Sequence, residues 1–87
     1  MRKTYQYILK IYFNHNLVQM RTTLHLTQTQ MAELLSMDDR SYIDLDHGKS
    51  CCSAVTLALY LAFVCDDVLE FVEGLRYAFN AGKDSAA

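Results

Sequence analysis

The sequence predicts an all-α protein, a compact bundle of five helices. The chain has 87 residues, which gives room for one domain and no more. It is 52% hydrophobic, a content typical of a chain that buries a core. It contains no proline and only three glycines, and tight hairpins depend on such residues. Helices joined by short connections are therefore favoured over a sheet.

Residues 1–15 form an N-terminal extension for which the pattern allows two structures. Apolar residues alternate from Tyr5 to Phe13, as they do in a strand. Tyr5, Ile8, Leu9 and Tyr12 also share one face of a helix, and helix is the favoured alternative. The Asn-His-Asn segment at 14–16 then predicts a cap or a break.

The helix-turn-helix domain is expected over residues 16–80, and its first helix covers about 16–24. Leu17, Met20 and Leu24 of this helix are expected to face inward. His25 stands where the helix must end. A left-handed backbone is common at such a place, and histidine tolerates it better than a β-branched residue does.

The next helix begins at Thr27, which is placed as its N-cap with Gln30 as the partner of a capping box. Its expected buried residues are Met31, Ala32, Leu34 and Leu35. A turn follows at Ser36 and Met37. Two short helices around a tight turn can hold one helix out from a small core, where it can enter a groove.

Asp38 is placed to cap the third helix, where its charge favours the positive end of the helix dipole. Tyr42 and Leu45 are expected to face the core, and Gly48 to end the helix.

A fourth helix is predicted over 54–64, with Ser53 as its cap, and it is apolar almost all round. Such a pattern predicts a central position in the bundle. A fifth helix over about 68–80 is capped by Asp66 or Asp67 and carries more apolar residues than one buried stripe needs. Residues 81–87 are expected to be a flexible tail.

With these elements in place, the chain resembles the phage repressor/Cro family of helix-turn-helix proteins, also called the XRE family. The resemblance covers roughly residues 16–73 and implies a fold of the lambda-repressor-like DNA-binding type. Its marks, in order, are Arg21, Leu26-Thr27-Gln28, Ala32, Leu35, Met37, Leu45-Asp46, Gly48-Lys49 and Thr56-Leu57. Ser36 departs from the family, which usually has glycine at this position.

The resemblance also implies roles for single residues. Arg21 and Asp46 would form a partly buried ion pair between the first helix and the end of the third. Gln28 and Lys49 would contact DNA phosphates. Arg40 could bind guanine in the major groove, and an aspartate can accept a hydrogen bond from cytosine N4. The implied DNA-binding set is Thr27, Gln28, Asp38, Asp39, Arg40, Ser41, Asp44 and Lys49.

The charge of the chain does not favour DNA overall, because the formal net charge is −2. Its distribution is uneven. Residues 1–32 contain Arg2, Lys3, Lys10 and Arg21 and no acid, whereas residues 66–73 contain four acids and no base. Any attraction for phosphate must therefore be local, toward the N-terminal half and Lys49.

Two functions follow from this sequence. The first is a cytoplasmic, sequence-specific transcriptional regulator that binds double-stranded operator DNA as a homodimer. Its dimer contact is expected on the fifth helix at Phe71, Leu75 and Phe79, and the extension 1–15 is a further candidate. The alternative is a protein–protein interaction module that uses the same scaffold, with an acidic recognition helix and weak or no DNA binding.

Other classes have little support in the sequence. The acid pairs Asp38-Asp39 and Asp66-Asp67 lack an accompanying nucleophile or phosphate-binding loop, so we predict no enzyme, cofactor or small-molecule ligand. Cys51, Cys52 and Cys65 are expected to be free thiols, and with His47 they lack the spacing of a zinc knuckle. The apolar stretches 4–13 and 54–65 are too short to span a bilayer, so no membrane partner is expected.

Overall fold

The computed structural model describes residues 2–86, and the side chains of residues 2–82. This part of the chain contains no strand and forms α1 (Arg2–Thr23), α2 (Gln28–Leu34), α3 (Asp39–Asp46), α4 (Ala54–Phe63) and α5 (Val68–Ala86). The prediction of a small all-α bundle is confirmed. Within residues 2–86, no helix combines the length and the apolar character needed to cross a membrane.

α1 is one continuous helix of 22 residues. The helical alternative for the extension is therefore correct, and the predicted break at 14–16 is wrong. Asparagine often ends a helix because its side chain bonds to the nearby backbone. Here the Asn14 amide donates to the end of α3 instead, and Asn16 accepts a hydrogen bond from the hydroxyl of Tyr60 on α4.

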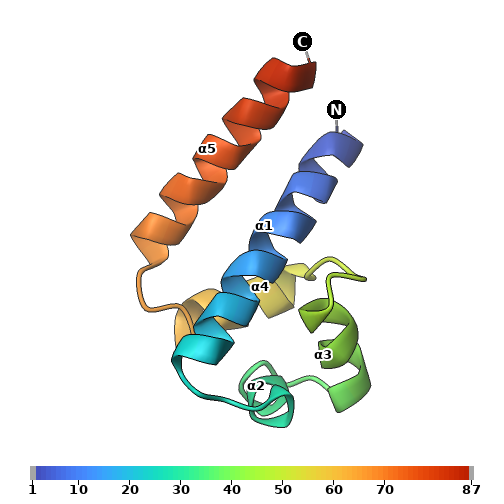
Figure 1. Ribbon diagram of the computed structural model, residues 1–87, viewed down its shortest axis with the longest axis vertical. Helices are drawn as coiled ribbons and strands as arrows, with labels where there is room; N and C mark the ends of the chain where they lie inside the picture. The colour runs from blue at the N-terminus through green and yellow to red at the C-terminus, as the bar shows by residue number, and fades with distance from the viewer. Residues whose placement is uncertain (1, 87) are drawn as a thin grey trace.

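α1 and α5 lie side by side and antiparallel, so that the start of α1 and the end of α5 project together from the same end of the molecule (Figure 1). The protein is elongated as a result, with extents of 41 × 25 × 20 Å. The extension 1–15 thus packs on the chain's own C-terminal helix. α5 continues to Ala86, past the expected end near residue 80. Residues 81–86 of the expected flexible tail are therefore helical, and residue 87 lies outside the described residues.

A close approach between α1 and α5 depends on Gly74. The Tyr12 hydroxyl donates a 2.7 Å hydrogen bond to the Phe71 carbonyl oxygen. A Cβ atom added at Gly74 would lie 2.3 Å from that hydroxyl oxygen, closer than real contacts allow. The Tyr12 side chain can therefore lie against α5 at this point because residue 74 has no side chain.

Capping side chains begin the short helices as expected. Thr27 accepts a hydrogen bond from the Gln30 backbone, and the Gln30 side chain accepts one from the Thr27 backbone, which completes a capping box. The other N-terminal caps are Asp38 for α3, Ser53 for α4 and Asp67 for α5. These predictions are confirmed, with Asp67 chosen over Asp66.

The connections around α2 require left-handed backbone at two non-glycine residues. His25 has φ of 57° and Ser36 has φ of 55°. The left-handed backbone expected at His25 is confirmed. Ser36 adopts the same conformation, which is less favourable for a residue with a Cβ atom than for glycine.

The core lies where α1 crosses α2, α3 and α4. Its buried residues come from all five helices and their connections: Phe13, Leu17, Met31, Ala32, Leu35, Tyr42, Leu45, Tyr60, Val64 and Phe71. Tyr60 stands among aromatic neighbours, with ring centroids 5.1 Å from Phe13 and 5.8 Å from Phe71.

Three expectations about the core are wrong. Leu24, expected to face inward, is 46% exposed, because it follows Thr23, the last residue of α1. α4 is not central: only the stripe of Thr56, Tyr60 and Val64 is buried, while Val55 and Phe63 are 68% and 69% exposed. Leu57, Leu59 and Leu61 are half-buried against the core, so α4 is covered only in part. Leu34 is 42% exposed rather than buried, because α2 ends beside it and only Met31, Ala32 and Leu35 turn inward.

Candidate nucleic-acid interface

α3 lies at one edge of the molecule, with one side in the core and the other in solvent (Figure 1). Tyr42, Leu45 and Asp46 are buried. The α3 outer face, as we call it, consists of exposed or half-buried residues: Asp39, Arg40, Ser41, Ile43, Asp44 and His47. Because an α-helix has 3.6 residues per turn, the buried residues and the outer-face residues lie on opposite sides of α3. A ligand can therefore approach the outer face without displacing a core residue.

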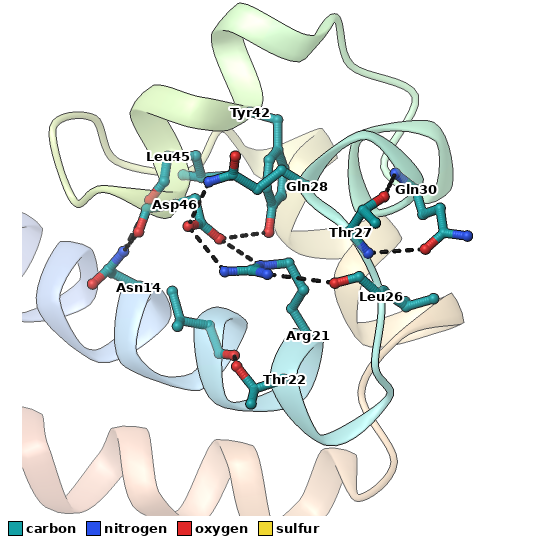
Figure 2. Close-up of polar contacts among 11 residues, drawn as sticks. Asn14, Arg21, Thr22, Leu26, Thr27, Gln28, Gln30, Tyr42, Leu45 and Asp46 are labelled. Atoms are coloured by element: carbon teal, nitrogen blue, oxygen red, sulfur yellow. Dashed lines mark hydrogen bonds and ion pairs between the residues drawn. The ribbon is translucent and has the colours of Figure 1, made fainter.

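Four hydrogen bonds converge on the buried carboxylate of Asp46 at the end of α3 (Figure 2). Arg21 on α1 donates from Nε at 3.0 Å to Oδ1 and from Nη2 at 3.4 Å to Oδ2. The Tyr42 hydroxyl donates to Oδ1 at 2.9 Å, and the side-chain amide of Gln28 on α2 donates to Oδ2 at 3.1 Å. The structure thus contains the ion pair between Arg21 and Asp46, extended into a network that joins α1, α2 and α3.

The network shifts the ionisation of its members. Burial alone would raise the pKa of the Asp46 carboxyl, but the hydrogen bonds from Arg21, Tyr42 and Gln28 and the charge of Arg21 hold that pKa below its ordinary value. Burial and the hydrogen bond to Asp46 raise the pKa of Tyr42 far above its usual range. The hydrogen bond to Asp46 raises the pKa of Arg21 further. The ion pair is therefore fully charged at neutral pH.

Asn14 supports α3, whereas its sequence context predicted a cap or a break in α1. Its amide donates to the carbonyl oxygens of Leu45 at 3.0 Å and Asp46 at 2.7 Å, at the C-terminal end of α3. The Leu45 carbonyl also accepts a hydrogen bond from the Gly48 backbone amide. α1 therefore fixes the C-terminal end of α3 through Asn14 and Arg21 together. Nothing in the local pattern of residues 14–16 could have revealed a bond to a segment so distant in sequence.

Gln28 lies differently from the expectation that its side chain would bind a DNA phosphate. Its amide points toward the protein interior and donates to Asp46 (Figure 2). In this conformation Gln28 supports the position of α3 rather than facing solvent. Thr27 is exposed, and its hydroxyl is used as the α2 cap.

The predicted base-contacting residues occupy the accessible side of α3. Arg40 is exposed, and among residues 2–82 the only ion pair is Arg21–Asp46, so Arg40 is not paired with Asp39 or Asp44. Asp39 accepts a hydrogen bond of 3.4 Å from the Thr29 hydroxyl. Asp38 caps the helix through Ser41, and that bond lowers the pKa of Asp38. Lys49 is exposed, in the connection that follows α3.

The residues expected at a dimer contact lie mostly inside the protomer. Phe71 is 3% exposed and belongs to the core, so it is not available to a partner. Leu75 is half-buried against the core, and Phe79 packs edge-on against Tyr5 of α1, with ring centroids 5.3 Å apart. The exposed apolar residues of this region are others: Phe63, Val68, Leu69 and Val72, on either side of the α4–α5 turn.

Residues 2–82 hold no cluster of three or more His, Cys, Asp or Glu side chains that could coordinate a metal ion. The three cysteines are free, and burial raises the pKa of the Cys52 thiol to about 12, which favours its protonated form at neutral pH.

Comparison of the chain with protein-family models, with curated proteins and with solved structures gives no match.

Proposed function

We propose that this chain is a transcriptional regulator of the helix-turn-helix type that binds operator DNA as a homodimer, as its resemblance to the phage repressor/Cro family implies. α2 and α3 would form the motif, and α3 would be the recognition helix. The observation that carries the proposal is the way α3 is held. Its buried side and its C-terminal end are fixed by α1 and α2, while its outer face is uncovered.

Arg40 is the residue we expect to contact a base. It is exposed and has no carboxylate partner among the described side chains, so its guanidinium is free to donate to guanine O6 and N7. Lys49 is expected to contact the DNA backbone from the connection after α3. Gln28 would act indirectly, by holding Asp46 and with it the position of α3.

The proposed dimer contact is the apolar surface around the α4–α5 turn, formed by Phe63, Val68, Leu69 and Val72. Exposed apolar residues grouped in this way mark association sites in many soluble proteins. A two-fold contact through this surface would repeat the same patch on both protomers and would set the spacing between the two copies of α3.

A binding titration with labelled duplex DNA tests the proposal. We expect the purified protein to bind duplexes at low salt, with an affinity that falls steeply between about 50 and 200 mM salt because bound phosphates release counterions. Arg40→Ala should reduce the difference in affinity between duplexes of preferred and of mixed sequence. Lys49→Ala should weaken binding to both kinds of duplex alike. No binding at low salt would refute the proposal.

The charge of α3 supports a second candidate, a protein-interaction module. Asp38, Asp39 and Asp44 outnumber Arg40 on and beside the α3 outer face, and Gln28 is turned away from solvent. A basic protein partner would complement such a surface better than a phosphate backbone does. This candidate predicts no duplex binding at low salt and a protein partner that is lost on Asp39→Lys but retained on Arg76→Glu, a change on α5 away from α3.

A further inference from the structure

The connection between α3 and α4 begins against the middle of α1. Asn14 donates to the Leu45 and Asp46 carbonyls there, and a Cβ added at Gly48 would touch the Asn14 amide at 3.5 Å. Gly48 has φ of +75°, which turns the chain back along α1. Lys49 follows directly and is exposed.

Further along, the same connection lies beside the N-terminal half of α1. Cys51 and Cys52 share a shallow hollow with Lys3 and Lys10 of α1. Lys10 precedes Asn14 by four residues and Lys3 precedes Lys10 by seven, spacings that keep all three on one side of the helix. The continuous α1 therefore brings two lysines next to the segment that leaves the proposed recognition helix.

The charge around this hollow has one sign. None of its lining residues is acidic, and α1 contains no acid at all. Two of the α3 acids, Asp38 and Asp39, are at the opposite, N-terminal end of the helix. Asp44 is closer, because it lines an adjoining hollow that also includes Cys51 and Cys52. The charged residues that line the lysine hollow itself are thus all basic.

We infer that Lys3 and Lys10, together with Lys49, form a backbone-binding surface that contacts duplex DNA phosphates beside the groove that α3 enters. The inference rests on the proposed function. Lys3 and Lys10 are separated by about 10 Å along the helix, a length over which roughly three phosphates of one strand project onto the duplex axis. These contacts would offset the repulsion between phosphates and the α3 acids, and they would explain how an acidic chain holds DNA.

The experiment compares single charge removals by their effect on salt dependence. Binding of a labelled duplex of mixed sequence is measured by anisotropy from about 50 to 200 mM salt for the unaltered chain, Lys3→Gln, Lys10→Gln and Arg76→Gln. Arg76 is exposed on α5 and serves as the control with the same loss of charge. Circular dichroism verifies that each variant keeps its helices.

We expect Lys3→Gln and Lys10→Gln each to make the negative slope of log affinity against log salt less steep by about 0.9. Each change should also weaken binding about five- to tenfold near 0.1 M salt. Arg76→Gln should leave the slope unchanged. Unaltered slopes in both lysine variants, with Lys49→Ala still weakening binding, would overturn this inference and leave the proposed function standing. An equal effect of Arg76→Gln would overturn it too. If the unaltered chain binds no duplex, both proposals fall.

Discussion

Asn14, in the middle of α1, donates a 2.7 Å hydrogen bond to the backbone carbonyl oxygen of Asp46, the last residue of α3. Arg21, about two turns further along α1, donates to the side chain of the same aspartate. The end of α3 is therefore held by α1 through both its backbone and its carboxylate. The proposed recognition helix would have to present its side chains in a fixed position, and this pair of contacts would provide that support.

Asn14→Asp should loosen α3. The change keeps the shape of the side chain but replaces the amide donor with a carboxylate, which would face two carbonyl oxygens and the negative end of the α3 dipole. We expect a loss of about 1–3 kcal/mol in the free energy of unfolding, measured with urea, and faster amide exchange in α3. His15→Ala, at the exposed next position, should change stability by less than about 0.5 kcal/mol. Equal stability of both variants would contradict this role.

The Arg21–Asp46 pair predicts a pH dependence of stability. The pKa of Asp46 is lower in the folded chain than its ordinary value of 3.8, so the folded state binds this proton less readily than the unfolded state. Its stabilising contribution is present above pH 3.8 and is lost as pH falls through the lower, folded-state pKa. Asp46→Asn should therefore cost about 1–3 kcal/mol at neutral pH, and this cost should shrink as pH falls below 3.8.

Urea titrations of the unaltered chain and of Asp46→Asn at several pH values measure this difference in the free energy of unfolding. Asp39→Asn, on the exposed side of the same helix, is the control and should differ from the unaltered chain by less than about 0.5 kcal/mol at neutral pH. A constant difference between Asp46→Asn and the unaltered chain across the acid range would show that the charge of Asp46 does not contribute.

Gly74→Ala should destabilise the packing of α1 on α5. The new methyl group would lie 2.3 Å from the Tyr12 hydroxyl, which is held by its bond to the Phe71 carbonyl oxygen. Alanine favours an isolated helix over glycine by about 1 kcal/mol, so a net loss of stability would isolate the steric effect. Tyr12→Phe removes the hydroxyl, and in that background Gly74→Ala should be less harmful. Additive effects of the two changes would contradict direct contact.

Leu69→Glu and Val72→Glu should convert the proposed dimer to monomers. Both side chains are exposed in the protomer, so the charge disturbs a partner's surface and not the core. Ile11→Glu, at an exposed apolar site on α1, is the matched control and should leave the dimer intact. Light scattering during size-exclusion chromatography gives the mass directly. A dimer that survives both α5 changes would place the contact elsewhere.

The sequence predicted the features that depend on neighbouring residues. Thr27, Asp38 and Ser53 cap helices because a side chain reaches a backbone amide three residues ahead, a relation visible in the chain itself. The left-handed His25 follows from the same local geometry. The core positions Tyr42 and Leu45 follow from helical periodicity within α3.

The features that depend on distant partners were not predictable in this way. Asn14 was expected to break a helix, because its bond to the end of α3 joins residues far apart in sequence. α4 was expected to be central, but Val55 and Phe63 on its apolar surface are exposed. Phe71 and the exposed Leu69 carry similar side chains two positions apart, and only the placement of α1 decides which one is buried.

Selection from a pool of random duplexes, with the purified chain and its Arg40→Ala variant, tests the central claim most directly. The account predicts that the unaltered chain enriches a motif with two-fold symmetry and that Arg40→Ala loses the preference for guanine at one position of each half-site. Lys49→Ala should keep the motif and bind all sequences more weakly. Failure to enrich any sequence, combined with no duplex binding at low salt, would contradict the assignment of α3 as a recognition helix.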